Sequence, residues 1–314
     1  MGRFFLISSI PILSYAETPR YAYITNQLDD SVSIISLEAQ SVIQTIKVGK
    51  APAGVALSQD GKKLFVTNPD SQDISFIDTA LMQESFRLKT GSGPVGIATN
   101  SNGHRVFVAD WYENVVKVID TEKRQIIHSI PVDKSPAGLI VDNKRHKLYV
   151  ANRDDNSITI IDLTTYQKIA KISVGKAPFG LALTRDGQRL YSVNVQDNTV
   201  SVVDTQKHQV LATINVGEWP YCAVLSPDDR WLYVTNQDES TVSKVDTQSQ
   251  QVVTDIAVDD TPEGIDITED GRYVYVANWG SGRVSIIDTA LNAVINTLET
   301  GQGSRAFGDF ITGR

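Results

Sequence analysis

Side chains able to do chemistry are few in this 314-residue chain, and they do not form a known motif. There is one cysteine, Cys222. The four histidines are His104, His128, His146 and His208. The chain has no GxxxxGK[ST] phosphate loop, no HExxH zinc motif and no GxSxG nucleophile elbow. We therefore predict no catalytic residue, no resident metal and no cofactor.

One glycine-rich stretch, GSGPVG at 91–96, fits the GxGxxG pattern of dinucleotide-binding loops. Such a loop must open a helix whose N-terminus meets the pyrophosphate. Here the stretch contains a proline and leads into a β-type segment, and similar turns recur along the chain. It therefore predicts an ordinary turn.

The elements that must position these side chains are repeated. The chain reads YVTN at 233–236, FVTN at 65–68 and YVAN at 149–152 and 275–278. The last position of this phrase recurs every 42 residues, at Asn26, Asn68, Asp110, Asn152, Asn194, Asn236 and Asn278. A fixed period of this size is typical of solenoids, propellers and arrays.

Each repeat reads as four short strands separated by turns. In the repeat at 52–91 the strands are GVALS, KLFVTN, ISFIDT and SFRLKTG, and Gly61 supplies a turn position. No segment shows a helical apolar period, so the sheet is expected to be antiparallel. Seven such units predict an all-β, seven-bladed β-propeller with four antiparallel strands per blade.

The chain ends are predicted to close the ring. Residues 306–311 align with the first strand of a repeat, and residues 20–26 align with the second. One blade is therefore expected to take one strand from the C-terminus and three from the N-terminus, which removes the open sheet edges. The domain prediction is a single propeller over 17–314.

Residues 1–16, MGRFFLISSIPILSYA, lie outside the period. A short apolar run followed by small residues is typical of a signal peptide, and the run is too short to span a bilayer. The alternative is a buried N-terminal strand. We expect export, with a periplasmic or secreted location and no membrane span elsewhere.

The repeated positions are predicted to build the scaffold, because a residue that every blade needs serves the blade. The aromatic position of the phrase should pack between blades, and its Asn should bond the backbone of the next turn. The Asp that ends each third strand should do the same at the other face. Cys222 aligns with Gly54, Gly96, Gly138, Gly180 and Gly264, so it is expected to fill a glycine slot.

These motifs resemble the YVTN-type β-propeller repeat family. They are xGxxPxG at 49–54 and 175–180, SxDG at 58–61 and [YF]V[TA]N, and the resemblance covers 17–314. It implies a propeller but not one function. Relatives include surface-layer proteins, exported propellers beside quinoprotein alcohol oxidation systems, and DNA-binding periplasmic propellers. Propeller lactonases and the haem-d domain of nitrite reductases resemble it more distantly.

A binding site is expected where the repeats differ, on the face that carries the second-to-third strand turns and the crossovers between blades. The small residues of one half of the ring give way there to aromatic and charged ones. The predicted ligand-binding residues are Trp111, Arg153, Phe179, Trp219, Tyr221, Glu263, Trp279 and Arg305. An aromatic wall facing a Glu and an Arg suits a small polar or flat ligand. Alternatively, Glu263 pairs with Arg305 and the aromatics plug the channel.

Acidic residues outnumber basic ones in the turns of this face, while the whole chain carries a net charge of −8. That field favours a cationic partner and disfavours nucleic acid, which needs a basic face. We expect a monomeric, non-catalytic binding or scaffold propeller for a protein partner or small ligand. The resemblance implies a link to a periplasmic quinoprotein or transport system.

The alternative is a propeller lactonase or hydrolase that holds a divalent cation at the channel mouth. Hard cations need several converging oxygens, and the carboxylates expected nearest the channel are Glu263, Asp110, Asp266 and Asp309. A third class, cell-surface architecture, normally uses a further domain or anchor.

Overall fold

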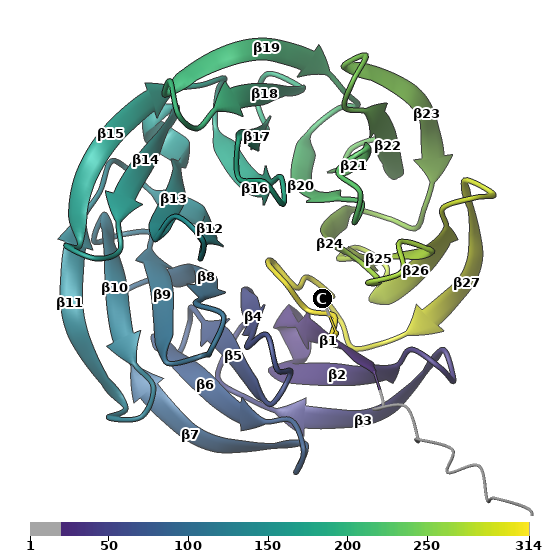
Figure 1. Cartoon of the computed structure of the whole chain (residues 1–314). Coiled ribbons are helices and arrows are strands. Elements are labelled where there is room, and N and C mark those ends of the chain that lie inside the picture. Colours follow the sequence, from purple (N-terminus) through teal and green to yellow (C-terminus); the bar gives the residue numbers. More distant parts are fainter. Residues whose placement is uncertain (1–19, 314) are drawn as a thin grey trace, which may run out of the picture.

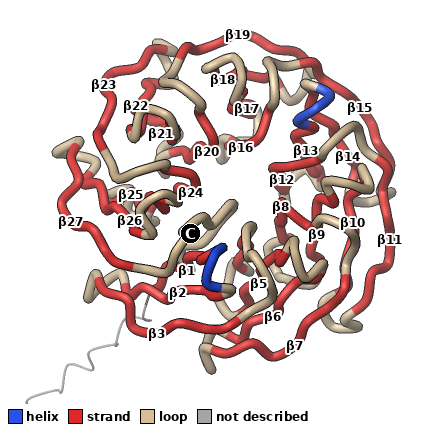
Figure 2. Tube along the Cα trace, turned by 180° about the vertical axis from the view of Figure 1, so that it is seen from behind, coloured by secondary structure: helices blue, strands red, loops and turns tan. Residues whose placement is uncertain are grey.

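Seven antiparallel sheets surround a central axis in the computed structural model, which describes residues 20–313 (Figure 1). Each 42-residue repeat builds one sheet, because its short β-branched and aromatic runs alternate with turns. The first strand of each blade lies next to the axis and the fourth lies at the rim (Figure 2). The seven-bladed all-β prediction is confirmed. The predicted signal peptide at 1–16 lies outside the described residues.

Blade 1 contains the N-terminal strands β1 (Tyr21–Asn26), β2 (Ser31–Ser36) and β3 (Ser41–Lys47). Blade 2 contains β4 (Val55–Leu57), β5 (Lys63–Asn68), β6 (Asp73–Asp78) and β7 (Gln83–Lys89). Blade 3 contains β8 (Pro94–Thr99), β9 (Arg105–Asp110), β10 (Val115–Asp120) and β11 (Gln125–Pro131). Blade 4 contains β12 (Pro136–Asp142), β13 (Lys147–Asn152), β14 (Ser157–Asp162) and β15 (Gln167–Ser173).

Blade 5 contains β16 (Pro178–Leu183), β17 (Arg189–Asn194), β18 (Thr199–Asp204) and β19 (Gln209–Asn215). Blade 6 contains β20 (Pro220–Leu225), β21 (Trp231–Asn236), β22 (Thr241–Asp246) and β23 (Gln251–Ala257). Blade 7 contains β24 (Pro262–Ile267), β25 (Tyr273–Asn278), β26 (Arg283–Asp288) and β27 (Ala293–Glu299). Two 3-10 helices, η1 (Gln27–Asp29) and η2 (Arg153–Asp155), are the helices of the described chain, and neither could cross a membrane.

The ends of the chain meet in blade 1, as predicted. The C-terminal segment 304–312 lies beside β1, where Tyr23 N–H donates to the Phe310 carbonyl at 3.0 Å and Thr312 N–H donates to the Tyr21 carbonyl at 2.9 Å. It forms isolated bridges rather than a regular strand, because Ala306 (φ 63°) and Gly308 (φ 112°) turn the backbone inwards. This turn brings the segment towards the axis of the ring.

The repeated side chains form the scaffold. The aromatic column is buried between blades; Tyr23 and Tyr275, for example, belong to one apolar cluster that spans blades 1, 2 and 7. The Asp column also behaves as predicted, since Asp78 Oδ1 accepts the backbone N–H groups of the next turn at 3.0 Å.

The prediction for the Asn column holds only in part. In blade 3 the column residue is Asp110, whose Oδ1 accepts the N–H of Glu113 in the next turn at 3.0 Å, but the asparagines also use side-chain partners. The amide of Asn26 donates to the hydroxyls of Ser31 and Ser33, at 3.0 and 2.9 Å, because the third strand places hydroxyls within reach.

Candidate functional site

The face that carries the crossovers and the second-to-third strand turns is called the crossover face below. Its backbone is fixed by one repeated contact: a residue in the turn accepts a hydrogen bond from the crossover. Asn156 Oδ1 accepts the N–H of Ala177 at 2.9 Å, and Asn198 Oδ1 accepts that of Trp219 at 3.0 Å. The equivalent residue has a left-handed backbone in six of the seven crossovers, with φ 54° at both Ala177 and Trp219, and Gly93 is the exception. The scaffold thus presents one side chain per blade around the axis.

Just inside this face, aromatic and charged side chains close the central channel. We call the group of Phe179, Tyr221, Phe307, Glu263 and Arg305 the plug. The rings of Phe179 and Tyr221 lie 4.2 Å apart between centroids, and the Phe307 ring lies 5.1 Å from Phe179. The Arg305 guanidinium lies 4.7 Å from the centre of the Phe307 ring. Such ring pairs add about 0.5–1.5 kcal/mol each to their burial.

Glu263 and Arg305 form a buried ion pair within the plug. Arg305 Nε donates to Glu263 Oε2 at 2.6 Å and Arg305 Nη2 to Oε1 at 3.2 Å. Gln237 Nε2 donates to the same Oε1 at 2.8 Å. Burial raises the pKa of the Glu263 carboxyl, and the Arg305 guanidinium opposes that rise. The pairing alternative considered from the sequence is therefore what the structure contains.

The remaining predicted site residues lie around the plug. Trp111 packs against the plug's apolar cluster, and the Arg153 guanidinium lies 5.8 Å from the centre of its ring. Trp279 lies at the junction of blades 7 and 1, where its Nε1 donates to Gln27 Oε1 at 2.8 Å. Trp219 is 39% exposed on the crossover face. The structure thus brings four of the eight residues together in the plug, sets Trp111 and Arg153 against it, and leaves Trp219 and Trp279 outside.

The opposite end of the channel is open. An inner chamber of about 140 Å³ lies directly beneath Phe179 and Phe307. It continues into an outer chamber of about 570 Å³, and the two share Ile140, Leu181 and Asp309 in their walls. The mouth of the outer chamber is lined by the first-to-second strand turns, including Asn100, Asn143 and Lys144 in blades 3 and 4.

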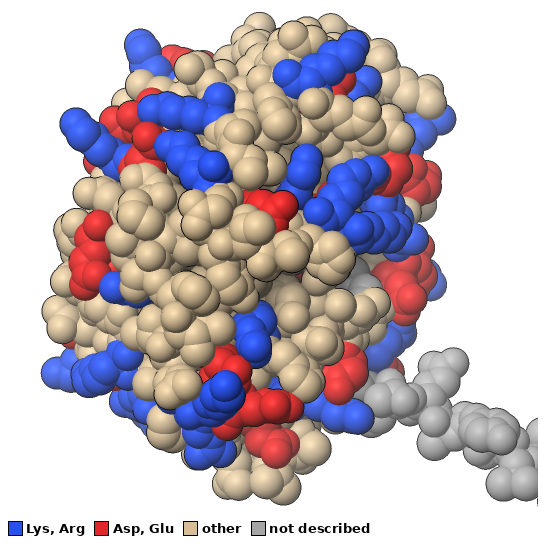
Figure 3. Space-filling model, turned by 60° about the vertical axis from the view of Figure 1, so that its left-hand side comes forward, with Lys and Arg blue, Asp and Glu red and all other residues tan. Residues whose placement is uncertain are grey.

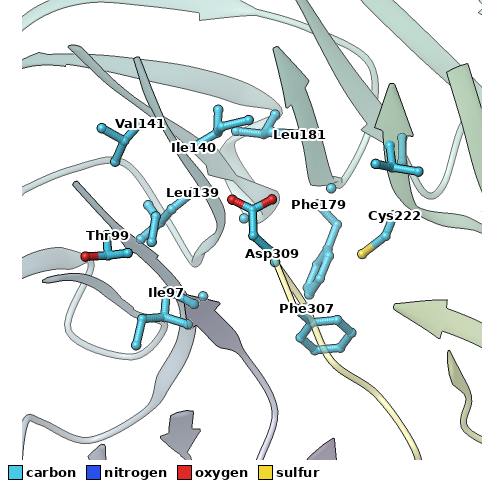
Figure 4. Close-up of a pocket in the computed structure, with 18 of the residues that line it drawn as sticks. Ile97, Thr99, Leu139, Ile140, Val141, Phe179, Leu181, Cys222, Phe307 and Asp309 are labelled. Carbon is cyan, nitrogen blue, oxygen red and sulfur yellow. The ribbon is translucent and has the colours of Figure 1, made fainter. Parts of the chain in front are cut away.

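Two residues of the C-terminal segment contribute to these chambers. Phe307, which the sequence analysis did not select, supplies one ring of the plug. Asp309 was considered only as a metal ligand, but its carboxylate points into the inner chamber between Leu139, Leu181 and the two phenylalanines (Figure 4). A sequence signal existed for Asp309. At the same repeat position the other blades have Leu57, Thr99, Val141, Leu183, Leu225 and Ile267.

The charge of the crossover face is lower than the turns alone suggest, because lysines reach it from the outer strands. Lys89 lies 3.2 Å from Asp73, and Lys171 lies 3.1 Å from Asp133. Lys117, on the third strand of blade 3, pairs with Glu113 at 2.6 Å. On the side of the ring that carries β11 and β15, basic and acidic side chains lie next to one another (Figure 3). Counting the turns by themselves overlooked these partners.

The carboxylates proposed for a divalent cation have separate tasks. Asp266 is buried and its Oδ2 accepts the N–H groups of Phe310 and Ile311, both at 2.9 Å. Glu263 is bound to Arg305, and Asp110 accepts the N–H of Glu113 at 3.0 Å. Among residues 20–313, no three His, Cys, Asp or Glu side chains lie close enough together to hold a metal ion.

Two protein families match parts of the chain. Residues 185–305 match the family described as "Cytochrome D1 heme domain", and residues 77–216 match "Lactonase, 7-bladed beta-propeller". Each match covers less than half of the chain, and no curated protein matches it. These findings support a seven-bladed propeller; the YVTN-type resemblance stays a prediction.

Solved structures show the same architecture. Hydrazine synthase of Kuenenia stuttgartiensis superposes with a TM-score of 0.74 at 20% identity, over 80% of this chain and 87% of that one. A functionally unknown protein of Desulfotomaculum acetoxidans gives 0.79 at 15% identity, over 92% and 99%. The dihydro-heme d1 dehydrogenase NirN in complex with DHE gives 0.69 at 16% identity, over 92% of this chain and 66% of that one. At these identities the likeness concerns the fold.

The chambers do not fit a haem of the kind that the first family name implies. Haem iron is held by His, Cys, Met or Tyr side chains. Neither chamber has a His or Met in its described walls. Cys222 lines the inner chamber, but burial raises the pKa of its thiol well above the ordinary range, so it stays protonated. His104 lies in a turn of blade 3, with Nδ1 3.2 Å from Glu122.

Proposed function

We propose that this protein is an exported, non-catalytic binding propeller that recognises a partner protein through its crossover face. The partner docks on the side chains that project from the crossovers and turns, while the plug beneath them forms a rigid floor. The link to a periplasmic quinoprotein or transport system, which the family resemblance implies, belongs to this proposal. So do the monomeric state and the preference for a cationic partner.

One observation carries the proposal: the backbone and exposure of Trp219. Six of the seven crossovers have a left-handed backbone at this position, which costs an L-residue roughly 1–2 kcal/mol. Other blades place small residues there, such as Ala51, Ser135 and Gly303. The crossover into blade 6 has a tryptophan there, Trp219, with φ 54° and 39% of the residue exposed. Strain retained at an exposed aromatic residue supports a role in binding.

Other exposed apolar side chains support the same face. Tyr112 is 73% exposed in the second-to-third strand turn of blade 3, and Leu28 is 64% exposed in that of blade 1. Aromatic anchors surrounded by polar side chains are the usual core of a protein interface. The opposite face offers a matched control, since Leu81 and Leu291 are 64% and 67% exposed in third-to-fourth strand turns.

Site-specific photo-crosslinking in the native host tests the proposal. A photoreactive phenylalanine analogue at position 112 or 219 should give a discrete crosslinked adduct from the exported fraction. The same group at position 81 or 291 should not give that adduct. Identical adducts from both faces, or none from positions 112 and 219, would contradict the docking surface. Recovery of the chain only from the cytoplasm would contradict export.

A further inference from the structure

A groove lies in the outer part of the crossover face, over blade 5. It has a volume of about 480 Å³ and lies between the crossover from blade 4 and the strands β18 and β19. We call it the rim groove, and its walls include Gly175, Asp197, Thr199, Ser201, Val210 and Thr213. It borders the proposed docking surface, because the Oδ1 of Asn198, the residue after Asp197, accepts the backbone N–H of Trp219 at 3.0 Å.

In blade 4 the equivalent place is filled by the protein's own lysines. Lys168 and Lys171 lie on the outer strand β15, 42 residues before the two outer-strand positions of the rim groove. The Lys171 ammonium lies 3.1 Å from Asp133 and 2.5 Å from Asp155, and the Lys168 ammonium lies 2.5 Å from Asp133. Blade 4 therefore shows which group this part of a blade accommodates, namely an ammonium bound to a carboxylate.

Other blades also fill this corner, where the third and fourth strands reach the crossover face, with a charged side chain. In blades 1, 2 and 7 a basic group contacts an Asp residue. These pairs are Lys47 with the Asp29 carbonyl at 2.9 Å, Lys89 with Asp73 at 3.2 Å, and Arg283 with Asp259 at 3.5 Å. In blade 3 the cation is Lys117, and in blade 6 the corner holds Asp255, which accepts the Ser243 hydroxyl at 2.7 Å.

Blade 5 has no such side chain. Val210 and Thr213 occur where blade 4 has its two lysines, Gly175 occurs where it has Asp133, and β19 carries no charged residue. The shorter side chains leave open the space that the lysines cover in blade 4, and the rim groove is that space. The groove thus lacks a cation that the equivalent corner of five other blades contains.

The carboxylate that would bind such a cation is still present. Asp197 corresponds to Asp155; its Oδ2 accepts the backbone N–H of Lys176 at 2.7 Å, and the exposed Lys176 ammonium lies 3.8 Å from its Oδ1. In blade 4, Asp155 accepts the Ser157 hydroxyl at 2.6 Å and binds a lysine as well. Because a carboxylate accepts several hydrogen bonds at once, Asp197 can bind a further ammonium group in the same way.

The surroundings of Trp219 add negative charge. Glu218 precedes Trp219 in the crossover, and the Glu239 carboxylate lies against Gly217 of the same segment. Lys176 is the basic residue of the adjacent crossover. The acidic groups outnumber it, so their field favours a basic segment of a partner over an acidic one.

We infer that the rim groove receives a lysine side chain of the partner protein, with its ammonium at Asp197 and its methylene stem along Val210. The inference rests on the proposed function, because it names the chemistry of the partner at the same docking surface. A compact ammonium suits this carboxylate better than the two-pronged guanidinium of arginine, because the Lys176 N–H already occupies one oxygen. An exposed apolar residue such as Val210 suits the stem of a lysine.

Filling the groove with lysines of this chain tests the inference. The reporter is the adduct that the photoreactive group at position 219 forms in the native host. Val210→Lys/Thr213→Lys gives blade 5 the two lysines of blade 4 and should reduce the adduct about tenfold, a loss that one close interfacial charge pair can produce. Both positions are exposed, so the fold should tolerate the change.

Ile126→Lys/Ser129→Lys is the matched control. It places the same lysines at the equivalent exposed positions of blade 3, where Lys117 already occupies the corner, so the adduct should persist. An equal loss in both variants would overturn the inference, because added positive charge alone would then explain it. An adduct that withstands the blade 5 lysines would overturn it and leave the docking surface in place. Absence of the adduct in the parent protein would contradict the docking surface itself.

A zero-length crosslink identifies the side chain in the groove. Carbodiimide treatment should join the Asp197 carboxyl to a lysine of the partner, and mass spectrometry of the adduct maps the bond. Asp197→Asn should abolish this bond and reduce the adduct at position 219 about fivefold, because it removes the charge and keeps an oxygen for the Lys176 N–H. Asp155→Asn, whose carboxylate binds Lys171, should leave both unchanged. A bond from Asp197 to Lys176 alone would overturn the inference.

Discussion

The two ends of the channel are built from the same repeat but have opposite characters. At the crossover end, blades 5 to 7 and the C-terminal segment bring large side chains to the axis, and these close the channel. At the other end the innermost strands carry aliphatic side chains of moderate size, and chambers of about 140 and 570 Å³ remain. Identical backbones therefore give either a sealed floor or an open site, depending on a few side chains per end.

The ion pair of the plug should produce the largest effect. Arg305→Met leaves the Glu263 carboxylate buried with Gln237 as its partner, and breaking a buried pair costs about 3–5 kcal/mol. Urea unfolding should show a loss of this size. The double variant Glu263→Leu/Arg305→Met should recover most of it, because no uncompensated charge remains. A single variant as stable as wild type would mean that the pair is not buried in solution.

Removing a ring should turn the sealed end into an open one. Phe179→Ala should cost about 3 kcal/mol, at the lower end for buried aromatics because the ring already borders a chamber. It should also make Cys222, which packs in the same apolar cluster, more accessible than in the wild type, where burial raises the pKa of the thiol and slows its reaction. Labelling with a thiol reagent under native conditions should therefore become faster.

A control is needed because any destabilised variant opens more often. Phe86→Ala removes a partly buried ring packed against the core of blade 2, far along the ring from Cys222. In Phe86→Ala, labelling of Cys222 should become faster only by as much as the more frequent unfolding of that variant explains. Equal labelling rates in the two variants would argue against the plug as the seal.

The C-terminal segment connects the two ends, since it supplies Arg305 and Phe307 to one and Asp309 to the other. Asp266 holds it through two backbone N–H groups. Asp266→Asn should cost about 2 kcal/mol, within the range for a hydrogen bond to a charged group. Hydrogen exchange should show faster exchange at Phe310 and Ile311, with the amides of β18 unchanged. Unchanged protection at those two positions would show that other contacts hold the segment.

The smallest effect is expected in a third-to-fourth strand turn of blade 4, which lies on the same face as the open mouth but outside its walls. The backbone N–H groups of Thr165 and Thr164 lower the pKa of Asp162. A carboxyl whose pKa is lower in the folded protein than in the unfolded chain stabilises the fold at every pH above its pKa in the unfolded chain. This contribution is lost as the pH falls through its pKa in the folded protein. Wild type should therefore lose stability more steeply than Asp162→Asn below about pH 4. If the stabilities of the wild type and Asp162→Asn fell equally steeply across that pH range, Asp162 would not make this contribution.

The scaffold was predictable because it is repeated. The aromatic position and the Asp turns recur from blade to blade, so each indicates the same blade geometry several times. The alignment of the chain ends indicates where the ring closes. The site was predicted in part, because Phe179, Tyr221, Glu263 and Arg305 do converge. The sequence had also left two alternatives open: that Glu263 pairs with Arg305, and that the aromatic side chains plug the channel. Phe307 was missed because the C-terminal segment departs from strand geometry at Ala306 and Gly308. The lysines that pair with carboxylates on the crossover face were missed because they come from strands that a count of turns leaves out.

The amino-acid sequence by itself determined the number of blades, their strand order and the place where the ring closes, because one four-strand unit recurs with a constant 42-residue period and the two chain ends together complete a further unit. The tertiary structure decided which end of the channel is sealed and which is open. That outcome depends on side chains from distant blades meeting at the axis, such as Tyr221, Glu263 and Arg305. Their distances follow from the closed ring as a whole and cannot be read from any single repeat.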